Sequence, residues 1–158
     1  MSAAGFEAKV LTVSDGVVAG TREDKSGEAV AELLASHGFA VVERRTVPDG
    51  IKPVAAALYE MTSGFAGLVV TTGGTGFGPR DLTPEGTGSV LVRSAPGLAE
   101  AMRLVNPLGR LSRGVAGTMG ESLVVNLPGS ASGACECLGA VIDVVPHALD
   151  LLSGGRPH

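Results

Sequence analysis

Short apolar segments alternate with amphipathic ones along the first half of this chain. Runs of apolar and β-branched residues predict strands at residues 6–13, 39–47 and 67–72. The helical spacing of apolar positions predicts helices between these strands, at about 26–37 and 51–62. Strands that alternate with helices in this way indicate an α/β fold, with a mostly parallel sheet covered by helices on both faces.

The second half of the chain has a less regular pattern. Its predicted elements are two helices at about 84–93 and 97–105, a hairpin over 114–127, and a last helix from about Ser132 into the 140s. Pro146 should interrupt that last helix. A hairpin among parallel strands makes the sheet mixed, so the predicted fold is a three-layer sandwich around a mostly parallel sheet. We expect residues 1–158 to form one domain.

The most informative segment follows the third predicted strand. It reads Gly73-Gly74-Thr75-Gly76-Phe77-Gly78-Pro79-Arg80-Asp81-Leu82-Thr83-Pro84-Glu85. Its glycines let backbone N–H groups approach an anion without a Cβ in the way. Arg80 adds a planar cation suited to phosphate, and Asp81 adds a carboxylate suited to a hard metal ion. Thr83 is predicted as the N-cap of the helix that follows. A flexible glycine-rich connection is the simplest alternative for this loop.

Three further loops follow apolar strands and should meet this glycine loop. They are Ser14-Asp15-Gly16, Pro48-Asp49-Gly50 and Asn126-Leu127-Pro128-Gly129-Ser130. The carboxyl ends of parallel strands share one edge of a sheet, which is where ligands bind in open α/β sheets. That edge would hold the carboxylates of Asp15, Asp49 and Asp81, although a role in a turn or a helix cap is the alternative for each.

Several familiar catalytic motifs are absent. Lys25-Ser26 is preceded by Asp24, so no Walker A step exists, and Pro79 occupies the position where a dinucleotide fingerprint would need glycine. The histidines, at positions 37, 147 and 158, lie outside the four loops. A reaction that needs no protein base fits better, namely nucleotidyl or phosphoryl transfer supported by backbone N–H groups, an arginine and magnesium.

Composition excludes other partners. The net charge is −4, and one tyrosine with four phenylalanines offers little stacking surface, so we expect no nucleic-acid partner. Cys135 and Cys137 are predicted to be core thiols, because no nearby histidine or further cysteine completes a zinc set. No apolar run approaches the length of a membrane span and no basic leader is visible, so no membrane partner and a cytoplasmic location are expected.

Together these segments resemble the molybdenum-cofactor biosynthesis family that includes molybdopterin adenylyltransferase and the gephyrin G domain. The glycine loop with Arg-Asp-Leu-Thr-Pro-Glu is the most specific part, and the resemblance covers nearly the whole chain. It implies a homotrimer and magnesium-dependent transfer of AMP from ATP to the terminal phosphate of molybdopterin, with release of pyrophosphate. It also implies hand-over of the product to a metal-insertion protein.

The resemblance assigns roles to individual residues. It implies that Asp49 and Asp81 are catalytic and bind Mg²⁺. The nucleotide-binding set it implies, with Arg80 added for its charge, is Gly73, Gly74, Thr75, Gly76, Arg80, Pro128, Gly129 and Ser130. The pterin-binding set it implies is Ser14, Asp15 and Ser26.

Two other functions are consistent with the same residues. One is a molybdopterin-binding scaffold without transferase activity, and the other is a nucleotide pyrophosphatase that would also use magnesium and these loops. Retention of both acids, Asp49 and Asp81, favours the transferase. The pathway could serve tungsten as well as molybdenum. The segment around Leu98, Met102 and Leu104 and the hairpin at 114–127 are the candidate subunit contacts.

Overall fold

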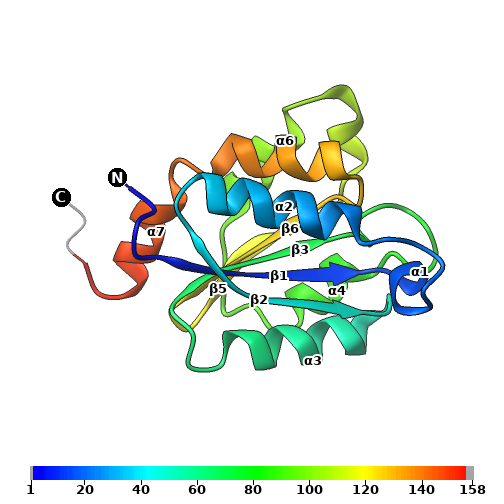
Figure 1. The fold of residues 1–158 in the computed structure, drawn as a ribbon, viewed down its shortest axis with the longest axis horizontal. Helices are drawn as coiled ribbons and strands as arrows, with labels where there is room; N and C mark the ends of the chain where they lie inside the picture. The colour runs from blue at the N-terminus through cyan, green and yellow to red at the C-terminus, as the bar shows by residue number, and fades with distance from the viewer. Residues whose placement is uncertain (1, 156–158) are drawn as a thin grey trace.

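The computed structural model describes residues 2–155, whose strands form one six-stranded sheet in the order β2-β1-β3-β6-β5-β4 (Figure 1). The strands are β1 Glu7–Val13, β2 Ala40–Val47, β3 Gly67–Thr72, β4 Arg93–Ser94, β5 Ala116–Met119 and β6 Ser122–Leu127. β2, β1, β3 and β6 are parallel, whereas β5 is antiparallel to both of its neighbours. The predicted mixed sheet and the hairpin are therefore confirmed.

Helices cover both faces of this sheet. They are α1 Asp15–Val18, α2 Lys25–Ser36, α3 Ile51–Thr62, α4 Thr83–Gly88, α5 Pro96–Arg103, the 3₁₀ helix η1 Pro107–Leu111, α6 Ala131–Val141 and α7 Val145–Leu152. In Figure 1, α2 and α6 lie on one side of the sheet and α3 lies on the other. Leu68 and Val70 of β3 belong to a core with α2, α5, α6 and α7, and Val69 belongs to a second core with α3. None of the helices in residues 2–155 has the length and apolar character needed to cross a membrane.

The structure corrects three predicted elements. The helix expected over 84–93 ends at Gly88, and Arg93–Ser94 forms the edge strand β4. The helix predicted from about Ser132 into the 140s is present as α6, but Pro146 does not interrupt it and instead lies in the first turn of a separate helix, α7. Proline is well accommodated there because the N–H it lacks would have no partner inside the helix. The loop after β1 contains the short helix α1, whose N-cap Ser14 accepts a hydrogen bond from the backbone of Val17.

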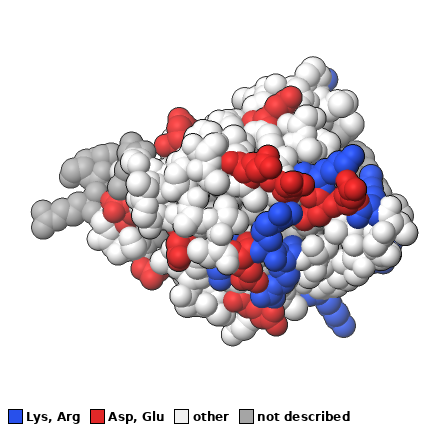
Figure 2. All heavy atoms as spheres, viewed as in Figure 1, with Lys and Arg blue, Asp and Glu red and all other residues white. Residues whose placement is uncertain are grey.

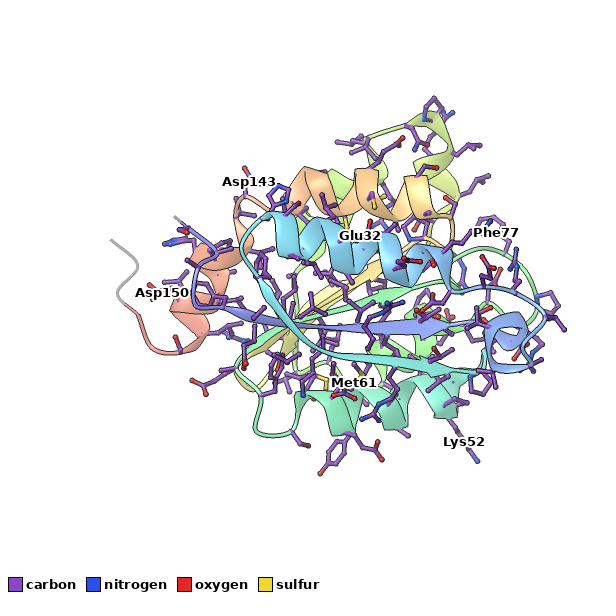
Figure 3. The ribbon with its side chains drawn as sticks, in the orientation of Figure 1. Glu32, Lys52, Met61, Phe77, Asp143 and Asp150 are labelled. Atoms are coloured by element: carbon purple, nitrogen blue, oxygen red, sulfur yellow. The ribbon has the colours of Figure 1, made fainter. Side chains whose placement is uncertain are left out.

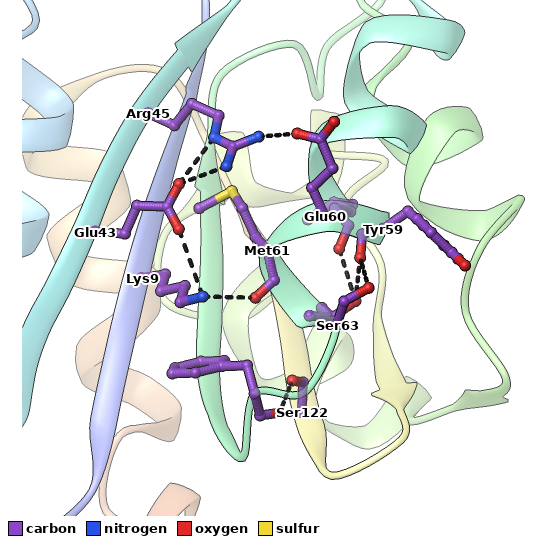
Figure 4. A network of polar contacts seen from close by, with 11 residues as sticks. Lys9, Glu43, Arg45, Tyr59, Glu60, Met61, Ser63 and Ser122 are labelled. Atoms are coloured by element: carbon purple, nitrogen blue, oxygen red, sulfur yellow. Dashed lines mark hydrogen bonds and ion pairs between the residues drawn. The ribbon is translucent and has the colours of Figure 1, made fainter.

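A polar network joins β1, β2 and α3 on the second face of the sheet (Figure 4). Lys9 Nζ donates to the carbonyl oxygen of Met61 at 3.0 Å and lies 3.4 Å from Glu43. Although burial disfavours its charge, the hydrogen bonds and charges of Arg45 and Lys9 lower the pKa of Glu43. Arg45 also pairs with Glu60 of α3. This network holds the edge strand β2 against β1 and α3, just before the loop that carries Asp49.

Asn126 is the polar centre of the sheet edge that carries the predicted loops. Its side chain is 2% exposed, and its Nδ2 donates to the hydroxyls of Thr71 at 2.9 Å and Thr87 at 3.0 Å. Its Oδ1 accepts from the backbone N–H of Val115 at 3.1 Å. One side chain thus joins β3, α4 and β6 to the segment before β5, directly beneath the glycine loop.

We expect Asn126→Leu to lower the free energy of unfolding by about 3 kcal/mol, because it leaves two buried hydroxyls and one partly buried N–H without their partner. Urea unfolding would measure this. Asn106→Ala is the matched control: Asn106 is only partly buried and caps η1, so its loss should cost about 1 kcal/mol. Equal destabilisation by the two variants would contradict the central role of Asn126.

Candidate functional site

A cleft with a volume of about 1110 Å³ opens at the carboxyl ends of β1, β3 and β6. The chain order reverses here, because β2 lies on one side of β1 and β3 on the other. All four predicted loops contribute to the cleft. Of the predicted site residues, its wall contains Ser14, Ser26, Asp49, Gly73, Gly74, Thr75, Gly76, Asp81, Pro128, Gly129 and Ser130. The volume lies slightly above the range that is usual for small-molecule sites.

The glycine loop requires glycine at its start. Gly73 has a φ of +103°, and a Cβ there would lie 2.3 Å from the carbonyl oxygen of Val13. Gly74 has a φ of +69°, and its Cβ would lie 2.3 Å from the hydroxyl oxygen of Thr83. Both positions combine a left-handed backbone with a close approach, so the loop packs against β1 and α4 as a defined turn rather than as a flexible connection.

The carbonyl groups of this loop are held on the side away from the cleft. Thr83 donates to the carbonyl oxygens of residues 73 and 74, through its hydroxyl at 2.8 Å and its N–H at 3.0 Å. Arg113 donates to those of residues 75 and 76, through its N–H at 2.9 Å and its Nε at 2.8 Å. Thr83 was predicted to be an N-cap; instead it is the first residue of α4, and its side chain anchors the loop.

The N–H groups of residues 74–77 are consequently available to a ligand. In a trans peptide each N–H points opposite to the preceding carbonyl, so these four N–H groups point away from Thr83 and Arg113. Within residues 2–155 they donate to no other group. A row of unpaired N–H groups in a concave loop is the arrangement that binds phosphate oxygens.

Asp49 and Asp81 border this loop. Asp49 Oδ1 lies 3.1 Å from the place that a Cβ on Gly74 would take, and Asp81 Oδ2 lies 3.0 Å from the corresponding place at Gly76. Asp49 Oδ2 accepts from the N–H of Asp15, and Asp81 Oδ2 accepts from the N–H of Gly78. In the described part of the chain the Oδ1 atom of each acid accepts no hydrogen bond, which leaves one oxygen of each for a ligand.

This donor set fits magnesium. Residues 2–155 contain no group of three or more acidic, histidine or cysteine side chains around one point. Mg²⁺ commonly takes only one or two carboxylates and completes its shell with water and substrate phosphates. Burial, together with the charges of Asp15 and Asp81, raises the pKa of Asp49. A divalent cation between the carboxylates would relieve that repulsion.

Asp15 and Arg80 lie beside the cleft rather than on its wall. Arg80 donates from Nε to Asp15 Oδ2 at 2.6 Å and from Nη2 to the carbonyl oxygen of Asp49 at 3.0 Å. Asp15 and Asp49 also form two reciprocal hydrogen bonds. Asp15 Oδ1 accepts from the N–H of Asp49, and Asp49 Oδ2 accepts from the N–H of Asp15. Asp15 was predicted to bind the pterin and Arg80 the nucleotide, whereas the structure pairs them with each other. Through Asp49 the pair joins the loops after β1, β2 and β3.

We expect Asp15→Asn to destabilise the protein at neutral pH and to have little effect in acid. The hydrogen bond from Arg80 lowers the pKa of Asp15. A carboxyl with a lowered folded pKa stabilises the protein above its unfolded pKa of about 3.9, and this contribution disappears as the pH falls through the folded pKa. The difference between the urea midpoints of variant and wild type should therefore shrink below about pH 4. A constant difference across this range would argue against the ion pair.

A further part of the cleft wall comes from the loop after β6 and from α6. Ser130 is the N-cap of α6 and accepts from the N–H of Gly133 at 3.1 Å. The cleft also contains residues that the sequence alone did not indicate, among them Arg22, Leu108, Leu111 and Glu136. These residues are exposed and chemically different from one another, and they form no recognisable motif in the sequence. Only their position in the fold identifies them as part of the cleft.

Charges of both signs share one face of the molecule (Figure 2), and the glycine loop lies at one end of it (Figure 3). On the face seen in Figure 2, acidic and basic side chains are intermingled and form no continuous basic area. Phe77, which is 71% exposed, lies at the end of the molecule where β1 and β3 finish, and Asp143 and Asp150 lie at the other end (Figure 3).

The fold and the cleft together define an α/β protein with a glycine-rich loop of unpaired N–H groups, in residues 2–155, at a sheet edge. The family model described as "Probable molybdopterin binding domain" matches residues 9–147. The chain therefore belongs to the molybdopterin-binding domain family of molybdenum-cofactor biosynthesis, as the sequence motifs predicted.

Individual relatives cover almost the whole chain. A molybdopterin adenylyltransferase from Helicobacter pylori is 39% identical over 92% of this chain and 86% of its own length. The crystal structure of the molybdopterin biosynthesis enzyme MoaB from Thermus thermophilus is 45% identical, with a TM-score of 0.88 over 97% of this chain and 99% of that one. The Mog protein from Mycobacterium ulcerans is 40% identical, with a TM-score of 0.86 over 94% and 99%.

Proposed function

We propose that this protein is a molybdopterin adenylyltransferase, which transfers AMP from ATP to the terminal phosphate of molybdopterin and releases pyrophosphate. The observation that carries the proposal is the row of free N–H groups at residues 74–77, bordered by the carboxylates of Asp49 and Asp81. The relatives named molybdopterin adenylyltransferase support it, as does the placement of all four predicted loops around one large cleft.

The proposed reaction needs positioning more than proton transfer. A terminal phosphate oxygen of molybdopterin attacks the α-phosphorus of ATP, a new P–O bond forms, and the bond to the pyrophosphate oxygen breaks. The attacking phosphate is already ionised, so no protein base is required. The N–H groups of residues 74–77 would bind the triphosphate without reorganisation, which is how preorganised donors lower a barrier. Ser14 and Ser26 would line the place of the pterin substrate, and the loop of Pro128, Gly129 and Ser130 would line that of the nucleotide.

Asp49 and Asp81 are the proposed Mg²⁺ ligands. A bound Mg²⁺ would neutralise charge that develops on the triphosphate oxygens during transfer. The carboxylates would hold the Mg²⁺ ion beside the glycine loop. Asp49 lies close to Gly74 and Asp81 lies close to Gly76, since an oxygen of each approaches the place that a Cβ on that glycine would take.

The test is to incubate purified protein with Mg-ATP and molybdopterin and to measure pyrophosphate and the adenylylated pterin. We expect both products to form in equal amounts, and only when molybdopterin is present. Pyrophosphate release from ATP alone would indicate a pyrophosphatase instead. Tight molybdopterin binding without transfer would indicate a scaffold.

We further propose that residues 1–158 act as one domain, that three copies assemble, and that the protein works in the cytoplasm and passes its product to a metal-insertion protein. Of the predicted contact residues, Met102 is buried and Leu98 packs on the core, whereas Leu104 is 84% exposed. Val105, the next residue, is also exposed, at 37%. This apolar surface supports a contact between subunits, and light scattering of the purified protein would give the number of copies.

A further inference from the structure

Arg113 is bound to the back of the glycine loop at three points. Its backbone N–H donates to the carbonyl oxygen of Thr75 at 2.9 Å, and its Nε donates to that of Gly76 at 2.8 Å. Its Nη2 donates to the carbonyl oxygen of Asp81 at 2.5 Å. Arg113 itself is not part of the cleft wall, so its contacts with the loop lie outside the proposed ligand site.

Glu85 fixes the remaining part of the guanidinium group. Arg113 Nη1 donates to Glu85 Oε2 at 2.6 Å, and Glu85 lies in the first turn of α4. The hydrogen bond from Arg113 lowers the pKa of Glu85, which keeps the pair ionised near neutral pH. A planar guanidinium with several donors can bind three acceptors in fixed directions at once, which a lysine ammonium cannot reproduce. Arg113 therefore joins the loop, Asp81 and α4 into one unit.

We propose that Arg113 is a positioning residue for nucleotide binding, a role that rests on the proposed function of the glycine loop. Its Nε holds the carbonyl of Gly76 and so directs the N–H of Phe77 away from Arg113, while its backbone N–H holds the carbonyl of Thr75 whatever side chain the residue carries. By holding the carbonyl of Asp81, it keeps that carboxylate beside the N–H groups of the loop. Arg113 touches neither substrate and acts only through the loop.

Because of its location, Arg113 can affect the glycine loop without being needed for the stability of the whole fold. Its side chain is 34% exposed and lies outside both hydrophobic cores. Loss of the side chain removes hydrogen bonds to the loop but creates no cavity in a core. The loop can then turn its peptide groups away from the cleft while the sheet and helices stay folded.

The test compares Arg113→Met, Arg113→Lys and the control Arg110→Met in the full chain. Arg110 is exposed, and its Nε bonds only to the carbonyl of Pro107. Calorimetry would measure binding of a non-hydrolysable Mg-ATP analogue and, separately, of molybdopterin. We expect Arg113→Met to lower the affinity for the ATP analogue by about 10- to 100-fold, because every 1.4 kcal/mol of lost binding free energy is about tenfold in affinity. The affinity for molybdopterin and the thermal midpoint should stay nearly unchanged. Arg113→Lys should be intermediate, and Arg110→Met should match the wild type.

A rescue experiment distinguishes positioning from a structural role. Millimolar ethylguanidinium added to Arg113→Ala should restore part of the affinity for the ATP analogue. The free ion can bind the three acceptors of the lost guanidinium group, which are the carbonyls of Gly76 and Asp81 and the carboxylate of Glu85. Unchanged ATP affinity in Arg113→Met, or a parallel loss of both affinities and of thermal stability without rescue, would overturn the positioning role alone. A wild-type protein that binds molybdopterin but no Mg-ATP analogue would overturn the proposed function and this inference together.

Discussion

Asp81→Asn should lower the rate of AMP transfer by about 10²- to 10³-fold, which corresponds to roughly 3 to 4 kcal/mol. The change removes a negative charge from the edge of the glycine loop, where the triphosphate and Mg²⁺ are proposed to bind. An asparagine oxygen can still accept the N–H of Gly78, so the loop should keep its shape. Pyrophosphate release in the presence of molybdopterin measures the rate.

Asp49→Asn should have a similar effect, because an amide oxygen can still accept the N–H of Asp15 while the charge is lost. Asp143→Asn is the matched control, since Asp143 is exposed at the opposite end of the molecule (Figure 3). Its rate should equal that of the wild type. If both cleft variants kept a rate within about threefold of wild type, a difference worth well under 1.4 kcal/mol, the two-carboxylate mechanism would be wrong.

Gly74→Val should weaken ATP binding by about tenfold or more while affecting molybdopterin less. A β-branched residue resists the φ of +69°, at a cost of order 1–3 kcal/mol, and about 1.4 kcal/mol already corresponds to tenfold. The added Cβ would also lie 2.3 Å from the Thr83 hydroxyl oxygen and 3.1 Å from Asp49 Oδ1. The carbonyls of the loop would move, and the row of N–H groups would be lost.

Calorimetry with each substrate would measure the two affinities. Gly88→Ala is the control, because Gly88 lies in α4 where a Cβ would meet no atom within 4 Å. It should leave both affinities unchanged. Unaltered ATP affinity in Gly74→Val, with molybdopterin binding lost, would mean that the glycine loop binds the pterin instead.

The sequence was sufficient for the elements whose signals are local. Alternating and continuous apolar runs identified β1, β2 and β3, and the expected helices α2 and α3 are present. It was insufficient where the local signal was ambiguous. Pro146 can either end a helix or begin one, and only the packing of Val145 and Leu149 into the core shows that it begins α7. The two-residue strand β4 exists through its pairing with β5.

For the site, the sequence by itself determined which loops meet and which side chains they bring, because parallel strands place their carboxyl ends at one edge and glycine alone tolerates the backbone at positions 73 and 74. The tertiary structure alone decided how those side chains are used. It pairs Arg80 with Asp15, directs the Thr83 hydroxyl to Gly73, and places Arg113 behind the loop. These contacts join residues 10 to 65 positions apart. Distances of that kind depend on how the whole sheet packs, and no local pattern in the chain encodes them.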